Sequence, residues 1–145
     1  MPAIRTRPVT LLLVDDDDVD AMGVERALKK LKMLNTVVRA RDGFEALEFL
    51  RTPDVVGRPF IVLLDLNMPR MNGIEMLMEL RDDPALSSSV VFILTTSEDE
   101  KDKLLAYQKH VAGYIVKNKL GDGFMSVMDM LGHYWRVVEL PVALG

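Results

Sequence analysis

The sequence predicts an α/β fold built on a doubly wound, five-stranded parallel sheet. Five short apolar segments alternate with longer segments in which apolar residues recur at helical spacing. Three of the short segments are almost uninterrupted apolar runs, as expected of strands that are buried on both faces of a parallel sheet. The 145 residues suit an open sheet, whereas a closed eight-stranded α/β barrel would need far more chain.

Each predicted strand is short and rich in aliphatic residues. VTLLLV, FIVLLD and VVFILT are candidates for buried strands, TVVRA is short and β-branched, and GYIV is short. In chain order, the strands span Val9–Val14, Thr36–Ala40, Phe60–Asp65, Val90–Thr95 and Gly113–Val116.

The predicted helices follow the strands and carry apolar residues three or four positions apart. In the first helix, Met22, Leu28 and Leu31 form the expected apolar side. The fourth opens with Ser97-x-x-Glu100, which is a capping-box pattern. The helices span Val19–Lys32, Gly43–Leu50, Gly73–Arg81, Ser97–His110 and, as an extended C-terminal helix, Phe124–Leu140.

Composition narrows the class of protein. A chain of this length with 49% hydrophobic and 28% charged residues suits a single globular domain over residues 1–145. The net charge of −4 gives no electrostatic reason to expect nucleic acid or an anionic membrane as a partner, and the lack of cysteine excludes disulfides and thiol catalysis. No apolar run has signal-peptide or membrane-span length, so we expect a cytoplasmic location.

Polar residues stand at the ends of four predicted strands: Asp15-Asp16, Asp65, Thr95-Thr96 and Lys117. Carboxyl ends of parallel strands meet at one edge of the sheet, and open α/β sheets bind their ligands there. Clustered carboxylates are tolerated where a hard divalent cation neutralises them. The sequence therefore predicts a Mg²⁺ site at this edge.

This set of residues favours phosphoryl chemistry. An aspartate carboxylate can attack a phosphoryl group and hold it as an acyl phosphate, while a metal ion and an ammonium offset charge on the phosphoryl oxygens. Asp65 is the best candidate for the nucleophile, because it is a single carboxylate after five apolar residues and precedes the long loop LNMPRMNG.

Five motifs resemble those of the receiver domain of two-component response regulators. They are Asp15-Asp16, LLDLNMP around Asp65, MNG ending at Gly73, ILTTS around Thr95 and GYIVK ending at Lys117. The resemblance covers about residues 9–138 and implies the flavodoxin-like strand order 2-1-3-4-5. It implies that a phosphohistidine on a sensor histidine kinase donates the phosphoryl group, and that the only reactions catalysed are the protein's own phosphorylation and dephosphorylation.

The resemblance also implies the residues of the phosphoryl and metal site. Asp65 would be the phosphoacceptor. Mg²⁺ would be bound by Asp15, Asp16, Asp65 and the backbone carbonyl of Asn67. Thr95 would donate its hydroxyl to a phosphoryl oxygen.

Three positions near the end of the last strand follow from the same resemblance. Lys117 would pair with the phosphoryl group and with a carboxylate, and Tyr114 would be an aromatic switch that changes rotamer as Thr95 moves. Asn118 departs from the family pattern, since receivers usually have a proline after this lysine, joined by a cis bond. A cis bond before a non-proline residue is costly, so we expect a trans bond and a rearranged loop after Lys117.

The C-terminal segment MLGHYWRVVELP resembles the ending of single-domain receivers that partner phytochrome-type sensor kinases. This segment also carries a second apolar stripe beyond the one that a helix covering a sheet needs, formed by Met130, Tyr134, Val137 and Leu140. A contiguous exposed apolar patch usually marks an interface. We therefore expect a homodimer through this helix and the tail at 139–145; in the alternative, the tail folds back on its own subunit.

The remaining acidic residues after the first strand, Asp17, Asp18 and Asp20, are expected to form a solvated helix start, since carboxylates are favoured near a helix N-terminus.

Two other functions are compatible with parts of the sequence. Asn118 raises the alternative of a pseudo-receiver that acts as a dimerisation or docking module without phosphorylation. A hydrolase that forms an aspartyl-phosphate is the other, but such enzymes generally have Asp-x-Asp at the nucleophile, whereas this chain has Asp65-Leu66-Asn67.

Overall fold

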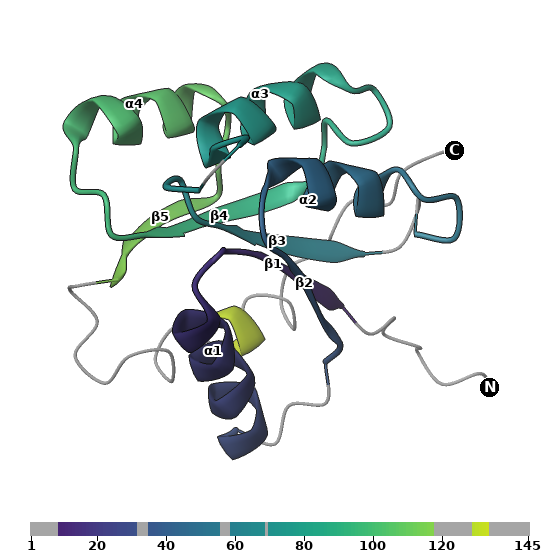
Figure 1. Cartoon of the computed structure of the whole chain (residues 1–145), viewed down its shortest axis with the longest axis vertical. Coiled ribbons are helices and arrows are strands. Elements are labelled where there is room, and N and C mark those ends of the chain that lie inside the picture. Colours follow the sequence, from purple (N-terminus) through teal and green to yellow (C-terminus); the bar gives the residue numbers. More distant parts are fainter. Residues whose placement is uncertain (1–8, 32–34, 56–58, 69, 118–128, 134–145) are drawn as a thin grey trace.

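The computed structural model of the chain describes residues 9–31, 35–55, 59–68, 70–117 and 129–133, and it contains the predicted five-stranded parallel sheet (Figure 1). The strands are β1 (Thr10–Val14), β2 (Val37–Ala40), β3 (Phe60–Leu64), β4 (Val90–Thr95) and β5 (Gly113–Val116). All neighbouring strands are parallel and lie in the order β2-β1-β3-β4-β5. The predicted fold class and strand order are confirmed.

Four helices connect the strands: α1 (Asp18–Lys30), α2 (Gly43–Leu50), α3 (Gly73–Asp82) and α4 (Glu100–Gln108). Residues 129–133 are also helical. They lie within the expected C-terminal helix Phe124–Leu140, whose other residues fall outside the described part of the chain.

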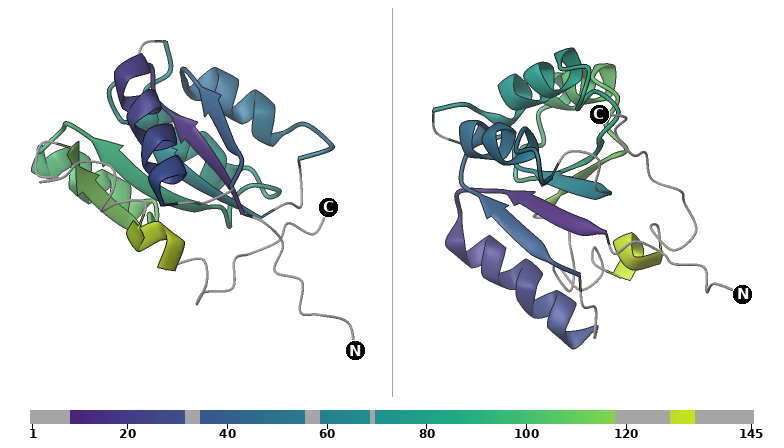
Figure 2. Two further views of the ribbon diagram at one scale, coloured as in Figure 1. Left: turned by 90° about the horizontal axis from the view of Figure 1, so that it is seen from below. Right: turned by 90° about the vertical axis from the view of Figure 1, so that its right-hand side faces the viewer.

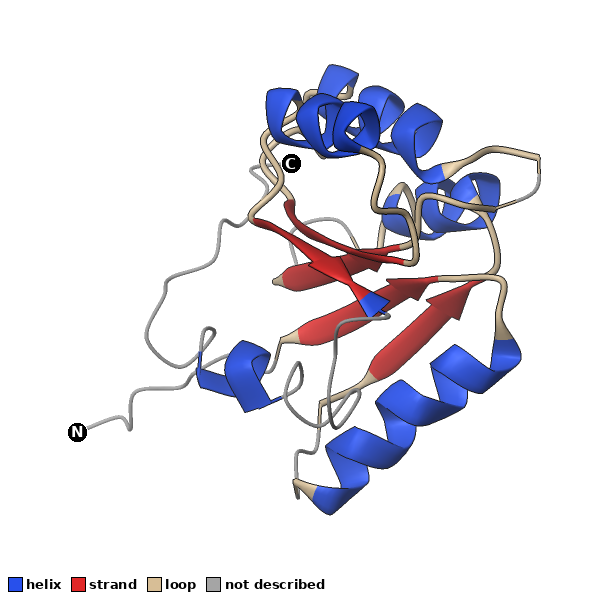
Figure 3. Cartoon of the chain, turned by 90° about the vertical axis from the view of Figure 1, so that its left-hand side faces the viewer, coloured by secondary structure: helices blue, strands red, loops and turns tan. Residues whose placement is uncertain are grey.

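The helices cover both faces of the sheet (Figures 2 and 3). On one face, Leu12 and Val14 of β1 join a core cluster with apolar residues of α2, α3 and α4. On the other face, Leu11 and Leu13 pack with α1 and with Leu131. Alternate residues of one strand thus serve two separate cores, which explains why the strand sequences are apolar throughout.

Two details of the helices differ from expectation. The Ser97 capping box is wrong, because α4 begins at Glu100 and its N-cap is Asp99, whose carboxylate accepts a hydrogen bond from the Lys101 amide. The Ser97 hydroxyl instead donates to Asp102 at 2.7 Å. A capping box does occur at the start of α3, between Asn72 and Glu75.

The apolar side predicted for the first helix is also partly wrong, since Met22 is 56% exposed. The buried residues of α1 are Ala21, Val24, Ala27 and Leu28. Three of these four side chains are small and therefore allow the helix to lie close to the sheet.

In the part of the chain that the structure describes, no helix has both the length and the apolar character needed to span a bilayer.

Candidate phosphoryl and metal site

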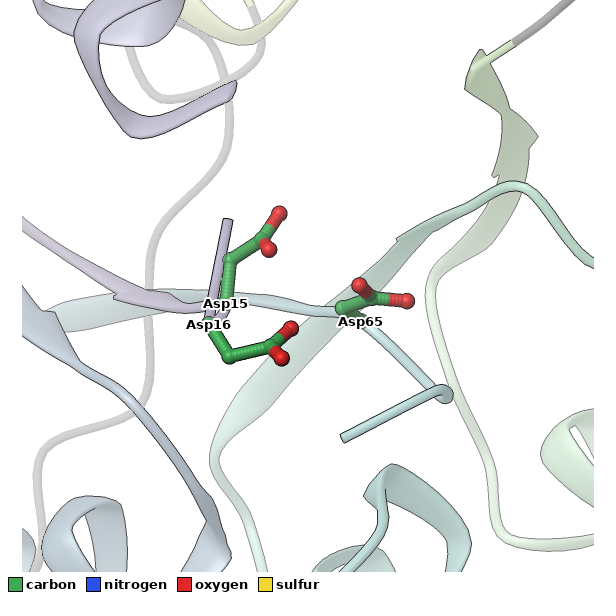
Figure 4. Close-up of side chains that lie close together, drawn as sticks. All are labelled: Asp15, Asp16 and Asp65. Atoms are coloured by element: carbon green, nitrogen blue, oxygen red, sulfur yellow. The ribbon is translucent and has the colours of Figure 1, made fainter. Parts of the chain in front are cut away.

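The carboxyl ends of β1 and β3 bring three carboxylates together, as expected from the topology (Figure 4). Asp15 and Asp16 follow β1, and Asp65 follows β3. Each of these residues offers one carboxylate oxygen, and the three oxygens lie within 4.8 Å of one another. Asp15 and Asp65 are buried, whereas Asp16 is exposed, so the cluster is accessible from one side.

The turn that carries Asp15 is fixed by its own hydrogen bonds. The Asp15 amide continues the sheet by donating to the Ala40 carbonyl, and the Asp15 carboxylate accepts from the Asp17 amide at 2.9 Å. Asp17 is the N-cap of α1, in agreement with the predicted helix start. Arg39 of β2 donates from Nε and Nη2 to the Asp15 carbonyl, at 3.2 Å each. The two acidic residues after β1 are thus held on an ordered turn.

Asp65 has a different partner on each carboxylate oxygen. Its Oδ1 atom accepts from the Thr95 hydroxyl at 2.9 Å and from the Asn67 amide at 3.1 Å. Its Oδ2 atom lies 3.5 Å from Nζ of Lys117. The geometry therefore brings Asp65, Thr95 and Lys117 to one point, as the sequence predicted; their roles in phosphoryl transfer remain a prediction.

Gly73 holds the loop after β3 against the Asp65 backbone. A Cβ atom at this position would lie 2.3 Å from the Asp65 carbonyl oxygen and 2.8 Å from Cα of Leu66, both well inside van der Waals contact. The Gly73 amide donates to the Leu66 carbonyl at 3.1 Å and closes the loop. The glycine of the MNG motif is thus required because backbone approaches backbone here.

Lys117 lies among three carboxylates. Its Nζ atom is 2.8 Å from Asp15, 2.5 Å from Asp20 and 3.5 Å from Asp65, and its side chain is only 9% exposed. Burial alone would lower the pKa of Lys117, but the hydrogen bonds to Asp15 and Asp20 outweigh burial and raise this pKa above its usual value. Lys117 is therefore a cation at neutral pH.

The acidic cluster fits a divalent cation. Burial raises the pKa of the Asp15 carboxyl, and the hydrogen bond from Lys117 offsets only part of this cost of ionisation. A hard cation among these carboxylates would supply the missing positive charge, and an all-oxygen set of this kind suits Mg²⁺ or a similar ion. The backbone carbonyl of Asn67 as a fourth ligand stays a prediction.

The expected switch residue is connected to Thr95 through one residue of the β4–α4 loop. The half-buried Tyr114 donates its hydroxyl to the Ser97 carbonyl at 2.9 Å. The Ser97 amide in turn donates to the Thr95 hydroxyl oxygen at 3.3 Å. A movement of Thr95 would therefore reach both Tyr114 and, through the Ser97 hydroxyl, Asp102 of α4.

Asp20 is the site residue that sequence reasoning missed. Asp17 and Asp18 are exposed as predicted, and Asp18 pairs with Arg39 and Arg41. The prediction of a solvated Asp20 is wrong, because its side chain is 24% exposed and pairs with Lys117. This contact depends on how α1 lies against the sheet, for which the sequence carries no local signal.

Several predicted positions fall outside the described residues. They are Asn118, Tyr134, Val137, Leu140 and the tail at 139–145. Of the predicted dimer residues, Met130 is described and is 42% exposed.

The geometry of the site agrees with the comparison to known families. A family model of the response regulator receiver domain matches residues 11–125. The chain belongs to this family. The curated response regulator Rcp1 of Synechocystis sp. is 35% identical over 140 residues, which cover 94% of this chain and 95% of Rcp1.

Solved receiver structures are similar over nearly the whole chain. The phosphorylated cyanobacterial phytochrome response regulator RcpA has a TM-score of 0.81 at 32% identity, with 94% of this chain and 99% of that chain covered. The Mn²⁺-bound form of Rcp1 has a TM-score of 0.80 at 33% identity, with 92% and 99% covered. The predicted resemblance to response regulators of the phytochrome type is confirmed.

Proposed function

We propose that this receiver is a stand-alone response regulator that accepts a phosphoryl group on Asp65 from a sensor histidine kinase, in a reaction that needs Mg²⁺. The observation that carries the proposal is the position of the Asp65 carboxylate, between the Thr95 hydroxyl, the Lys117 ammonium and two further carboxylates. Such an arrangement favours transfer of a phosphoryl group to a carboxylate, because the hydroxyl and the ammonium can stabilise charge on the phosphoryl oxygens.

In the proposed reaction, a carboxylate oxygen of Asp65 attacks the phosphorus of the donor's phosphohistidine. A phosphorus–oxygen bond forms, the phosphorus–nitrogen bond breaks, and the imidazole nitrogen keeps the electron pair and is later protonated by solvent. The Thr95 hydroxyl and the Lys117 ammonium donate to phosphoryl oxygens and stabilise the charge there. Mg²⁺ bound by Asp15, Asp16, Asp65 and the Asn67 carbonyl would neutralise the remaining negative charge.

The output of this reaction would be a change in protein contacts. Phosphorylation would draw Thr95 toward the phosphoryl group and disturb its hydrogen bond with the Ser97 amide. Tyr114 bonds the same loop residue, so its rotamer and the surface of α4 would change together. The partner would be a sensor histidine kinase of the phytochrome type, as the likeness to RcpA suggests. We expect this receiver to act in the cytoplasm without nucleic acid or membrane partners.

Intact-protein mass spectrometry tests the proposal. The protein is incubated with acetyl phosphate or phosphoramidate, with and without MgCl₂, as wild type, as Asp65→Asn and as Asp82→Asn, a control in α3. We expect one added phosphoryl group on wild type and on the control, only with Mg²⁺, and none on Asp65→Asn. If wild type takes up no phosphoryl group even from a sensor kinase, the pseudo-receiver alternative replaces this proposal.

The proposal extends to a single domain of residues 1–145, with a core at about 9–138, that forms a homodimer through the C-terminal helix and the tail at 139–145. Leu131 is fully buried against the sheet while the adjacent Met130 is exposed, so this short helical segment has an outward apolar position. Met130→Glu should lower the dimer fraction in size-exclusion chromatography with light scattering. His133→Glu, at an exposed position of the same segment, is the control. A monomeric wild type would refute the dimer.

A further inference from the structure

Lys117 is bonded to carboxylates of two kinds. Asp15 and Asp65 belong to the group of three carboxylates that fits a divalent cation. Asp20 does not belong to that group and comes from α1 rather than from a strand end. Yet Asp20 makes the shortest of the three contacts, at 2.5 Å, compared with 2.8 Å for Asp15 and 3.5 Å for Asp65.

This arrangement matters because Lys117 and a divalent cation would share two carboxylates, those of Asp15 and Asp65. A cation bound by Asp15, Asp16 and Asp65 draws electron density from the carboxylates that hold the ammonium, and it repels the ammonium directly. A lysine bonded only to Asp15 and Asp65 would then either oppose binding of the cation or leave the site. A carboxylate outside the group of three removes this conflict.

We infer that Asp20 is a positioning residue, which anchors the Lys117 ammonium from outside the metal-binding carboxylates so that a divalent cation and the lysine can occupy the site together. The inference deepens the proposed function, because it explains how Lys117 stays beside Asp65 during phosphoryl transfer. Asp20 affects phosphoryl transfer through Lys117, while its charge also adds a general attraction for the cation.

In the described part of the chain, the acidic neighbours of Asp20 at the start of α1 have partners other than Lys117. The N-cap of α1 is Asp17, whose carboxylate accepts from the amides of Val19 and Asp20. Asp18 pairs with Arg39 and Arg41. Asp18 therefore provides a matched control, since it is the same residue type in the same turn of α1 with different partners.

The first experiment measures the affinity for Mg²⁺ by titrating ¹⁵N-labelled protein with MgCl₂ and following backbone amide shifts. The variants are wild type, Asp20→Asn, Lys117→Met and the double variant. Asp20→Asn has two expected effects on Mg²⁺ binding. The loss of one negative charge weakens Mg²⁺ binding to a similar degree with or without the lysine. The shift of Lys117 onto Asp15 and Asp65 weakens Mg²⁺ binding only where the lysine is present. We therefore expect Asp20→Asn to raise the Kd at least about threefold more in the presence of Lys117 than in the Lys117→Met background.

Asp18→Asn is carried through the same cycle and should show no dependence on Lys117. The amide spectra of all variants also report whether the fold is intact, so a misfolded variant is recognised directly. A coupling below twofold between Asp20 and Lys117, or an equal coupling for Asp18, would overturn the inference.

The second experiment measures the rate of phosphorylation by acetyl phosphate at saturating MgCl₂. We expect Asp20→Asn to slow labelling about tenfold, Asp20→Glu to restore part of the rate, and Asp18→Asn to match wild type. If wild type is labelled but Asp20→Asn reacts at the same rate, Asp20 does not position the lysine. If no donor labels wild type while the Mg²⁺ coupling is present, the proposed function fails and the anchoring of Lys117 stands.

Discussion

At each edge of the sheet, a cationic side chain lies among several oxygen atoms, but the oxygens differ in kind. At the carboxyl edge, the Lys117 ammonium contacts the carboxylates of Asp15, Asp20 and Asp65. At the amino edge, the Arg81 guanidinium donates to four backbone carbonyls at 2.7–2.9 Å, those of Ser87, Ser89, Lys109 and His110.

The oxygen partners of Lys117 can be exchanged for others, whereas those of Arg81 cannot. Carboxylates can be drawn to a metal ion or joined to a phosphoryl group, and the contacts of Lys117 with Asp15 and Asp65 would then change. Backbone carbonyls are neutral and fixed in the chain, so Arg81 joins the end of α3 to the segments that precede β4 and β5. One of these carbonyls belongs to His110, whose backbone has a positive φ of 60°. The carboxyl edge is therefore suited to chemistry and the amino edge to stability.

The largest effect on stability is expected at the amino edge. Arg81→Met leaves four carbonyls without their charged donor and should lower the free energy of unfolding by about 2–4 kcal/mol. The affinity for Mg²⁺ should stay within twofold of wild type. Urea denaturation and MgCl₂ titration measure the two quantities.

Arg51→Met serves as the control for that variant. The Arg51 side chain is 47% exposed, and its ion pairs among the described residues are with Glu79 and Asp83. Because exposed ion pairs contribute little, this substitution should lower the free energy of unfolding by less than about 1 kcal/mol. An Arg81→Met variant as stable as Arg51→Met would mean that the amino edge is not held by this residue.

Substitution of Gly73 should lower both the stability of the fold and the rate of phosphorylation, since this glycine supports the Asp65 backbone. Gly73→Ala places a Cβ atom against the Asp65 carbonyl and should destabilise the protein by about 1–3 kcal/mol. It should also slow phosphorylation at least tenfold, because the carboxylate moves with its backbone. Gly23→Ala, within α1, should instead stabilise the protein by about 0.5–1 kcal/mol. Normal labelling of Gly73→Ala would refute this role of the glycine.

At the carboxyl edge we expect a substitution to weaken Mg²⁺ binding without lowering stability, which is the opposite of the pattern for Arg81→Met. Asp16→Asn removes one of the proposed metal ligands and should weaken Mg²⁺ binding at least about tenfold. In Mg²⁺-free buffer the same variant should be as stable as wild type or more stable, because repulsion among the three carboxylates is relieved. A loss of more than about 1 kcal/mol in unfolding free energy without Mg²⁺ would contradict the separation of the two edges.

The smallest effect concerns pH and the buried Asp42, the N-cap of α2. Burial alone would raise the pKa of Asp42, but hydrogen bonds from the Glu45 amide and from Arg70 lower it below its usual value of 3.8. A depressed pKa stabilises the fold above the usual value, and this contribution is lost as the pH falls below 3.8.

Asp42→Asn should therefore cost less than about 1 kcal/mol at pH 7, because asparagine also caps helices well. The difference from wild type should shrink at acidic pH, as denaturation at pH 7, 5 and 3 would show. If the difference in unfolding free energy between wild type and Asp42→Asn grows as the pH falls, the lowered pKa of Asp42 is contradicted.

Sequence patterns predicted the sheet and most of the site because both depend on short-range signals. Apolar runs identified the strands, and the parallel topology then placed the residues after them, among them Asp15, Asp65 and Lys117, at one edge. The link between Thr95 and Tyr114 through Ser97 needed the actual path of the β4–α4 loop.

The predictions that were wrong concern the placement of α1 and the start of α4. The Asp20–Lys117 contact requires a particular placement of α1, and the same placement leaves Met22 exposed while small residues face the sheet. At α4, Ser97 fits the capping pattern, but Asp99 lies nearer the helix start and caps it, which leaves the Ser97 hydroxyl free to bond Asp102. The choice between these two polar residues is set by where the helix begins, which the capping pattern alone does not give.

The central claim is that Asp65 itself carries the phosphoryl group. Protein treated with acetyl phosphate and MgCl₂ is reduced with borohydride, which converts an aspartyl phosphate to homoserine, and is then digested and sequenced by mass spectrometry. The account predicts homoserine at position 65 alone, and none when Mg²⁺ or the donor is left out. Homoserine at position 15, 16 or 20, or a stable phosphoryl adduct that borohydride does not convert, would contradict it.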